Sequence, residues 1–156
     1  MKYSGLILLI SGLLAVTNSC SQESKELGTY VGATPCIQGA QPLQGIPKDS
    51  DCEFIKWELT LYVNERNEPV KYKLGYTYGI SQPNTQGFKD GKKIEIQGEW
   101  KMAKGSKTNP AATIYQLDYG VSLVKLSDGI LHLLDNEKRL MVGTPGYSFT
   151  LNKISK

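Results

Sequence analysis

Apolar and polar residues alternate in short runs from residue 28 to the end of the chain. The clearest run spans 53–64. Its apolar side chains fall on odd positions: Ile55, Trp57, Leu59, Leu61 and Val63. Successive side chains of a strand point to opposite faces of a sheet, so this spacing predicts a strand with one face turned toward a core. Trp57 is therefore expected to point inward.

The next run has the opposite phase, with its apolar residues on even positions: Val70, Tyr72, Leu74, Tyr76 and Tyr78. The turn-forming segment 64–68 between the two runs predicts a hairpin. A third run follows an expected turn over 89–92, and its apolar residues are Ile94, Ile96, Trp100 and Met102. Trp100 is expected to point inward, and Gly98 indicates a bend or bulge.

The rest of the chain continues this pattern, and helix is nearly absent. Further strands are expected over 29–34, 114–119, 121–126, 130–134 and 147–154. Turns are expected over 127–129 and 135–138, and the long segment 37–51 is rich in Gly, Pro and Gln and predicts a loop. About eight strands with short links favour an antiparallel meander that closes into a small barrel without exposed edges. A two-sheet sandwich is the alternative.

The first residues form a different pattern. After the positive start Met1-Lys2-Tyr3, residues 6–16 are an apolar run of eleven residues, well short of the roughly 20 that a helix needs to span a bilayer. This is typical of an export signal. The run leads through Thr17-Asn18-Ser19 into Cys20, which resembles the lipobox of bacterial lipoproteins and implies cleavage before Cys20 and a diacylglycerol on its thiol. The alternative is an ordinary signal peptide that leaves Cys20 as an odd thiol.

These patterns divide the chain into a lipoprotein signal peptide over 1–19, a polar tether over 20–27 and one domain over 28–156. Removing the signal leaves 156 − 19 = 137 residues, a common size for a single domain. One lysine is removed with it, so 18 − 1 = 17 basic residues stand against 15 acidic residues. They are scattered singly or in pairs, which excludes an electrostatic footprint for a nucleic-acid partner.

Six short segments of the domain form a recognisable set of motifs: Gly28-Thr29-Tyr30-Val31-Gly32, Thr34-Pro35-Cys36, the segment from Asp51 to Leu61, Gly98-Glu99-Trp100, Ile114-Tyr115-Gln116-Leu117, and the segment from Leu131 to Glu137. Together they resemble the N-terminal barrel domain of the NlpE-type copper-resistance lipoprotein family, over residues 28–152. The resemblance implies a lipocalin-like barrel anchored in the outer membrane. It also implies a role in copper tolerance or in reporting envelope stress and surface contact, with an envelope signalling protein as partner.

Cys36 and Cys52 are the two cysteines that remain once Cys20 carries lipid. Cys36 ends the first expected strand and Cys52 precedes the second, so antiparallel pairing brings both to the same end of the barrel. The oxidising envelope favours a disulfide, and closing a loop of about 15 residues stabilises by roughly 3 kcal/mol in the chain-entropy model. In the reduced form, two soft thiolates could hold copper(I). Unpaired thiols are the third alternative.

Other candidate groups have simpler structural interpretations. His132 alternates with Leu131 and Leu133, which predicts an exposed strand position, and nothing around it indicates a catalytic triad. Met102 and Met141 could supply thioether ligands, but isolated methionines more often fill gaps in a core. Some tyrosines could line a cavity for an apolar ligand but more often pack a sheet: Tyr62, Tyr72, Tyr76, Tyr78, Tyr115 and Tyr119.

Three functions remain open, and none is enzymatic. The first is a lipid-anchored envelope protein of the copper-resistance or stress-sensing type, attached to a membrane of the bacterial cell envelope. The second is a lipocalin-like carrier, which would need an interior cavity free of side chains. The third is an envelope protein that acts only through a protein-binding surface.

Overall fold

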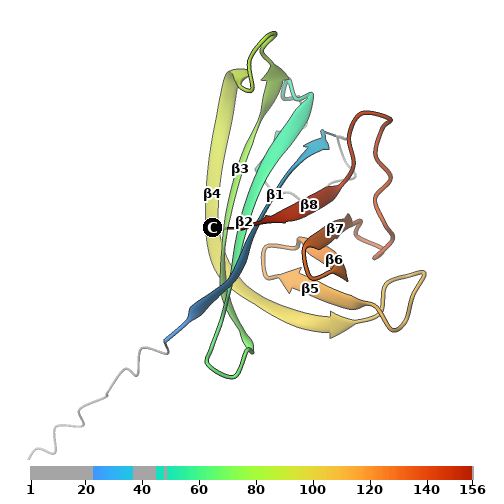
Figure 1. Cartoon of the computed structure of the whole chain (residues 1–156). Helices are drawn as coiled ribbons and strands as arrows, with labels where there is room; N and C mark the ends of the chain where they lie inside the picture. The colour runs from blue at the N-terminus through green and yellow to red at the C-terminus, as the bar shows by residue number, and fades with distance from the viewer. Residues whose placement is uncertain (1–22, 37–44, 48, 156) are drawn as a thin grey trace, which may run out of the picture.

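The computed structural model describes residues 23–36, 45–47 and 49–155, so the expected signal peptide and Cys20 lie outside the described residues. The described chain folds into a closed antiparallel barrel whose strands follow sequence order (Figure 1). The strands are β1 (Lys25–Pro35), β2 (Phe54–Val63), β3 (Pro69–Ser81), β4 (Phe88–Lys104), β5 (Thr113–Leu117), β6 (Ser122–Ser127), β7 (Ile130–Leu134) and β8 (Thr150–Ile154). The predicted all-β barrel is confirmed. Within the described ranges, no helix is long and apolar enough to cross a membrane.

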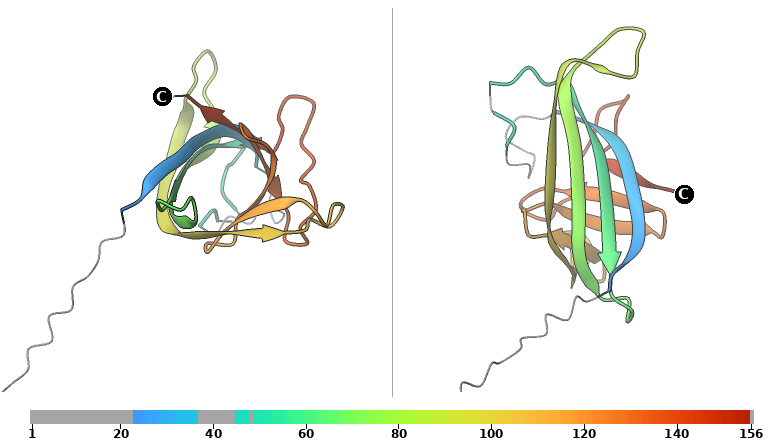
Figure 2. Two further views of the ribbon diagram at one scale, coloured as in Figure 1. Left: turned by 60° about the horizontal axis from the view of Figure 1, so that its bottom comes forward. Right: turned by 90° about the vertical axis from the view of Figure 1, so that its left-hand side faces the viewer.

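Pairing between β1 and β8 closes the ring, which is seen nearly end-on in Figure 2. In this pairing Thr29 lies opposite Ile154, and Val31 lies opposite Asn152. Closure removes the two terminal edges that an open meander of this size would expose to solvent. A single sheet therefore encloses the core, in place of the two packed sheets of the sandwich alternative.

The barrel has two distinct ends (Figure 1). At one end β1 begins at Lys25, which pairs with Val63 at the end of β2. At the other end β1 finishes at Pro35, which pairs with Phe54 at the start of β2. The connection from β3 to β4 lies at this second end, since Ser81 pairs with Phe88. We call the first the tether end and the second the far rim.

Side chains on the inward phase of the strands fill the barrel. Trp57 and Trp100 are each 4% exposed, which confirms the predicted inward direction of both. The Trp57 Nε1–H donates to Thr34 Oγ1 at 2.9 Å, and the Trp100 Nε1–H donates to the Tyr62 carbonyl at 2.9 Å. Other buried core residues include Tyr30, Ile55, Leu59, Leu61, Tyr72, Leu74, Tyr76, Leu123, Leu131, Leu133 and Leu151. Among the described residues, every buried side-chain nitrogen or oxygen has a hydrogen-bond partner.

The ends of two strands differ from the expectation. Residues 25–27, assigned to the tether, belong to β1. Their polar sequence carries no alternation, but pairing with the end of β2 satisfies their backbone groups and extends the strand. At the other terminus β8 begins at Thr150 and not at Tyr147, because Tyr147 instead forms an isolated bridge with Thr144.

The expected turn over 89–92 is wrong, since these residues belong to β4. The chain reverses earlier, over 82–87. Asp90 has a φ of 52° and lies where the pairing between β3 and β4 shifts register. The Asp-Gly sequence therefore makes a β-bulge within a continuing strand, a role that uses the same left-handed backbone as a turn.

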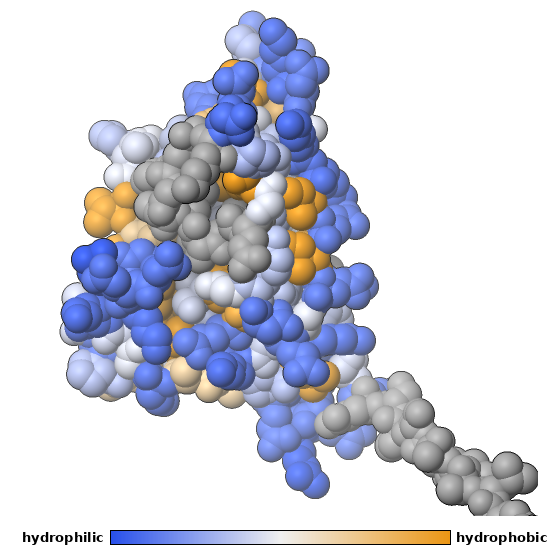
Figure 3. Space-filling view, turned by 180° about the vertical axis from the view of Figure 1, so that it is seen from behind, coloured by the Kyte–Doolittle hydropathy of each residue, from blue (hydrophilic) through white to orange (hydrophobic). Residues whose placement is uncertain are grey.

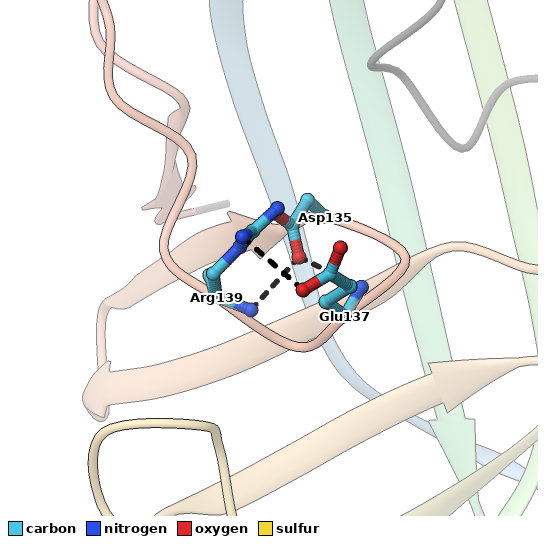
Figure 4. Close-up of polar contacts among 3 residues, drawn as sticks. All are labelled: Asp135, Glu137 and Arg139. Atoms are coloured by element: carbon cyan, nitrogen blue, oxygen red, sulfur yellow. Dashed lines mark hydrogen bonds and ion pairs between the residues drawn. The ribbon is translucent and has the colours of Figure 1, made fainter.

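The predicted turn at 135–138 follows β7 and is organised by one carboxylate (Figure 4). Asp135 Oδ1 accepts hydrogen bonds from the backbone N–H groups of Glu137 at 2.8 Å and Arg139 at 2.9 Å. Asp135 Oδ2 accepts from Arg139 Nε–H at 2.8 Å, and Arg139 Nη1 lies 3.1 Å from Glu137 Oε2. These bonds lower the pKa of Asp135 below its usual range, the backbone bond from Arg139 most of all.

Trp57→Ala and Trp100→Ala are each expected to lower the free energy of unfolding by about 3–5 kcal/mol. Each substitution removes a buried ring and leaves the hydrogen-bond acceptor of that ring without a donor. Urea denaturation measures the loss. Glu58→Ala, at an exposed position beside Trp57, is the control and is expected to change stability by less than about 0.5 kcal/mol. A tryptophan variant that unfolds at the wild-type urea concentration would contradict the inward register.

Candidate functional site

The far rim holds both cysteines of the domain. Cys36 follows β1 and Cys52 precedes β2, their Cα atoms are 5.7 Å apart, and their sulfurs form a disulfide. The Cys36 backbone N–H donates to the Glu53 carbonyl at 3.0 Å, and the Glu53 N–H donates to the Gly79 carbonyl at 2.9 Å. Backbone hydrogen bonds therefore carry the β1–β2–β3 pairing up to the disulfide. The predicted pairing of these cysteines is confirmed.

The disulfide decides which ligands the rim offers. A disulfide sulfur carries no thiolate charge, and thiolates are the groups that bind soft metal ions. Among the described residues, no group of three or more His, Cys, Asp or Glu side chains could hold a metal ion. Copper(I) binding by Cys36 and Cys52 therefore requires prior reduction.

A polar contact joins Glu53, the residue after Cys52, to the end of β3. Glu53 Oε2 accepts hydrogen bonds from both the backbone N–H and the hydroxyl of Ser81. The hydroxyl bond, followed by the backbone bond, lowers the pKa of Glu53 below its usual range. The residue next to the disulfide is thereby tied to the end of β3.

Three aromatic rings gather on the outer wall below the rim. The Phe54 ring centroid lies 4.7 Å from that of Phe88 and 5.4 Å from that of Tyr147. Gly79 pairs with Phe54 and has no side chain to separate Phe54 on β2 from Phe88 on β4. The Lys56 Nζ lies 5.4 Å from the Phe88 ring centroid, within cation–π range. We call Phe54, Phe88 and Tyr147 the rim aromatic cluster.

Sequence reasoning missed the rim aromatic cluster. One signal was present, since Phe54 is an apolar residue on an even position in a strand whose other large apolar residues are mostly on odd positions. Phe88 and Tyr147 lie on other elements and could be joined to it only by the fold. Tyr147 remains 42% exposed. The space-filling view from behind shows hydrophobic residues as separate patches on a mostly hydrophilic surface (Figure 3).

The barrel interior is packed with side chains. A cavity for an apolar ligand would leave its lining accessible to a solvent-sized probe, yet the inward tyrosines Tyr72, Tyr76, Tyr78 and Tyr115 are at most 5% exposed. These residues pack the sheet, as their strand positions favour. The other two candidates, Tyr62 and Tyr119, are half-buried. A hollow of about 370 Å³ opens at the rim instead, lined by residues of both charge signs that include Asp49, Tyr78 and Lys89.

One hydrogen-bond network joins a buried residue of β3 to β4 and to the turn after β5. The Tyr72 hydroxyl donates to Asp118 Oδ1 at 2.8 Å, and the Glu99 N–H donates to Asp118 Oδ2 at 2.9 Å. A Cβ on Gly98 would overlap this carboxylate, so Gly98 permits a close approach. Of the predicted bend or bulge, the bulge is absent, because the pairing with β3 stays in register at Gly98. The Glu99 bond and then the Tyr72 bond lower the pKa of Asp118. Burial, and then the bond to Asp118, raise the pKa of Tyr72.

His132 and the two methionines do not join the cysteines. His132 is half-buried and not exposed as expected: its Nε2 lies 2.9 Å from the Met141 carbonyl and its Nδ1 lies 3.0 Å from the Thr150 hydroxyl. Both ring nitrogens are therefore engaged. Met141 is buried, whereas Met102 is 50% exposed on β4, near the tether end.

No protein-family model matches the chain, and no curated protein or solved structure matches it either. Its function is therefore inferred from the geometry of the barrel and from the resemblance carried by the sequence motifs.

Asp118→Asn is expected to destabilise the protein in a pH-dependent manner. The folded-state pKa of Asp118 is lowered, so its contribution is fully present above the ordinary value near 4 and is lost as the pH falls through the lowered value. The difference in unfolding free energy between wild type and variant should be largest near pH 6 and shrink below about pH 4. Urea denaturation across this range measures it, with Glu99→Gln as control. A difference that does not vary with pH would contradict the network.

Proposed function

We propose that this chain is a lipid-anchored, non-enzymatic protein of the bacterial envelope, of the NlpE-like stress-reporting type, that acts by binding another envelope protein. The observation that carries the proposal is the placement of the two ends of β1. Lys25 lies at the tether end and Pro35 at the far rim, and ten residue steps of strand span about 33 Å. A lipid on Cys20 would hold the tether end at the membrane and direct the far rim away from it.

The features of the far rim support contact with a protein. The disulfide between Cys36 and Cys52 fixes the rim where β1 ends and β2 begins, which lowers the entropy that this part of the rim loses when a partner binds it. The rim aromatic cluster presents Tyr147 to solvent, and aromatic side chains are enriched in protein interfaces. The packed interior gives no support to the alternative of a carrier for a hydrophobic molecule. The outer membrane is the proposed location, following the sequence resemblance.

Radiolabelled palmitate is expected to enter the wild-type protein made in a lipoprotein-processing bacterium and to be absent from Cys20→Ser, because the lipid joins the Cys20 thiol. Gel fluorography of the immunoprecipitated protein measures the incorporation. Cys36→Ser is the matched control and should still carry label. Label that survives in Cys20→Ser, or a mature N-terminus at another residue, would refute the anchor.

Copper(I) binding is a second candidate function, supported by the proximity of the two sulfurs. Free thiolates are required, so the bonded form should bind copper(I) weakly. The reduced protein is expected to bind one copper(I) tightly, and a Cys36→Ser, Cys52→Ser protein should not. Competition with a chromogenic copper(I) chelator measures both affinities under reductant. Equal weak binding by the two reduced proteins would remove copper from the function and leave the cysteines as a structural link.

A further inference from the structure

Strand β4 is paired on only one side over most of its length. It pairs with β3 from Phe88 to Glu99, but with β5 only from Trp100 to Lys104. No other described strand pairs with β4. The second edge of β4, from residue 88 to 98, therefore remains open in the described part of the chain, although pairing between β1 and β8 closes the ring nearer the tether end. An unpaired strand edge is a template for another strand.

The backbone groups that face this open edge can be identified from Glu99. Its N–H donates to Asp118 Oδ2 at 2.9 Å, and its carbonyl accepts from the Asp118 N–H at 3.0 Å. Both groups therefore point away from β3. Backbone direction alternates along an antiparallel strand, and the register with β3 is regular from Glu99 back to Lys93. The N–H and C=O groups of Lys93, Glu95 and Gln97 consequently point toward the open edge.

These groups are available. Lys93, Glu95 and Gln97 are exposed, and their edge-facing amides and carbonyls have no hydrogen-bond partner among the described residues. Lys93 and Glu95 form an ion pair with each other on the outer face.

The open edge is limited at both ends. Below it, Asp118 occupies the position of a neighbouring strand by accepting from Glu99, and Gly98 makes room for its carboxylate. Above it, the β-bulge at Asp90 interrupts the regular pairing, and bulges are a common protection of strand edges. A short stretch from Lys93 to Gln97 is thus left accessible between two blocked ends. We call this stretch the β4 window.

We propose that the β4 window binds an extended segment of another protein, which adds a strand to the barrel wall beside β4. Main-chain hydrogen bonds to Lys93, Glu95 and Gln97 would hold the segment, as in other cases of strand addition. On the outer face an acidic residue fits opposite Lys93 and a basic residue opposite Glu95. On the inner face apolar residues fit beside the parts of Ile94 and Ile96 that remain exposed, since both are only half-buried and Gly45 already lies near the Ile94 side chain.

A second copy of this chain is a poorer occupant, although its Glu95 could lie opposite Lys93. Two copies related by a two-fold axis would pair β4 antiparallel, which sets the tether end of one barrel beside the far rim of the other. The two rims then could not both be directed away from one membrane. The choice of a foreign segment over a second copy therefore rests on the proposed function, which supplies the membrane orientation. The open edge itself rests only on the strand pairing.

Glu95→Pro tests the main-chain part of the proposal. Proline removes the Glu95 N–H, which faces the open edge and not β3, so the barrel should still fold. Glu95→Ala is the matched control, since it loses the same side chain and keeps the N–H. The probe is a fluorescein-labelled peptide, Ser-Thr-Val-Lys-Val-Glu-Thr-Ser, added to the full chain in detergent. Fluorescence anisotropy should show binding to the alanine variant and binding at least about fivefold weaker to the proline variant.

Exchanging charges tests the side-chain part. A control peptide has its Lys and Glu exchanged, and a Lys93→Glu, Glu95→Lys protein has the complementary exchange. Each protein should prefer its charge-matched peptide by about fivefold, since two cross-strand pairs are gained. Amide hydrogen exchange in the wild-type protein gives an independent readout. The peptide should slow exchange at Lys93, Glu95 and Gln97 and leave Ile94 and Ile96 unchanged, because the latter two amides already face β3.

Three results would overturn the proposal. They are equal affinity of the Glu95→Pro and Glu95→Ala proteins, no binding of either peptide at millimolar concentration, and a wild-type dimer in analytical ultracentrifugation that Glu95→Pro converts to monomer. The third result would assign the edge to a second copy. None of the three depends on Cys20, so a failed palmitate experiment and a failed peptide experiment are distinguishable.

Discussion

A closed barrel requires a partner for both edges of every strand, and in this protein the strands are too unequal in length to meet that requirement everywhere. Strands β1 to β4 contain 11, 10, 13 and 17 residues, whereas β5 to β8 contain 5, 6, 5 and 5. The short half closes the ring near the tether end and leaves the upper parts of β1 and β4 without a shared neighbour. The far rim and the open edge of β4 both follow from this mismatch.

The connection between β1 and β2 contributes Gly45 and Ile46 to the packing beside β4. Ile46 packs against the core cluster, and an added Cβ on Gly45 would lie 3.3 Å from the Tyr76 hydroxyl and 3.4 Å from Ile94. Gly45 has a φ of 95°, so its lack of a side chain serves both the backbone and the close approach. The disulfide between Cys36 and Cys52 joins the two ends of this connection.

The same mismatch separates the two proposed binding surfaces from each other. At the far rim, contact would involve side chains, with Phe54, Phe88 and Tyr147 as the apolar part and Lys56 beside them. Along the β4 window, contact would involve main-chain groups, with Lys93 and Glu95 selecting charge. The far rim lies beyond the bulge at Asp90, where β4 begins at Phe88.

Alternation along the chain determined the class of fold, the inward direction of Trp57 and Trp100, and the meeting of Cys36 with Cys52, because a strand's pleat and an antiparallel turn are local consequences of sequence. Only the tertiary structure decided how the Asp90-Gly91 pair is used, since the same left-handed backbone serves a turn and a bulge and the choice depends on the length of the neighbouring strand. It also decided the roles of Gly98 and His132, whose contacts with Asp118 and Met141 come from elements that sequence spacing does not bring together. The open edge of β4 was also decided only by the tertiary structure. It depends on how far each strand pairs with its neighbours, which the alternation of apolar and polar residues does not determine. Lipidation of Cys20 stays a prediction of the sequence alone.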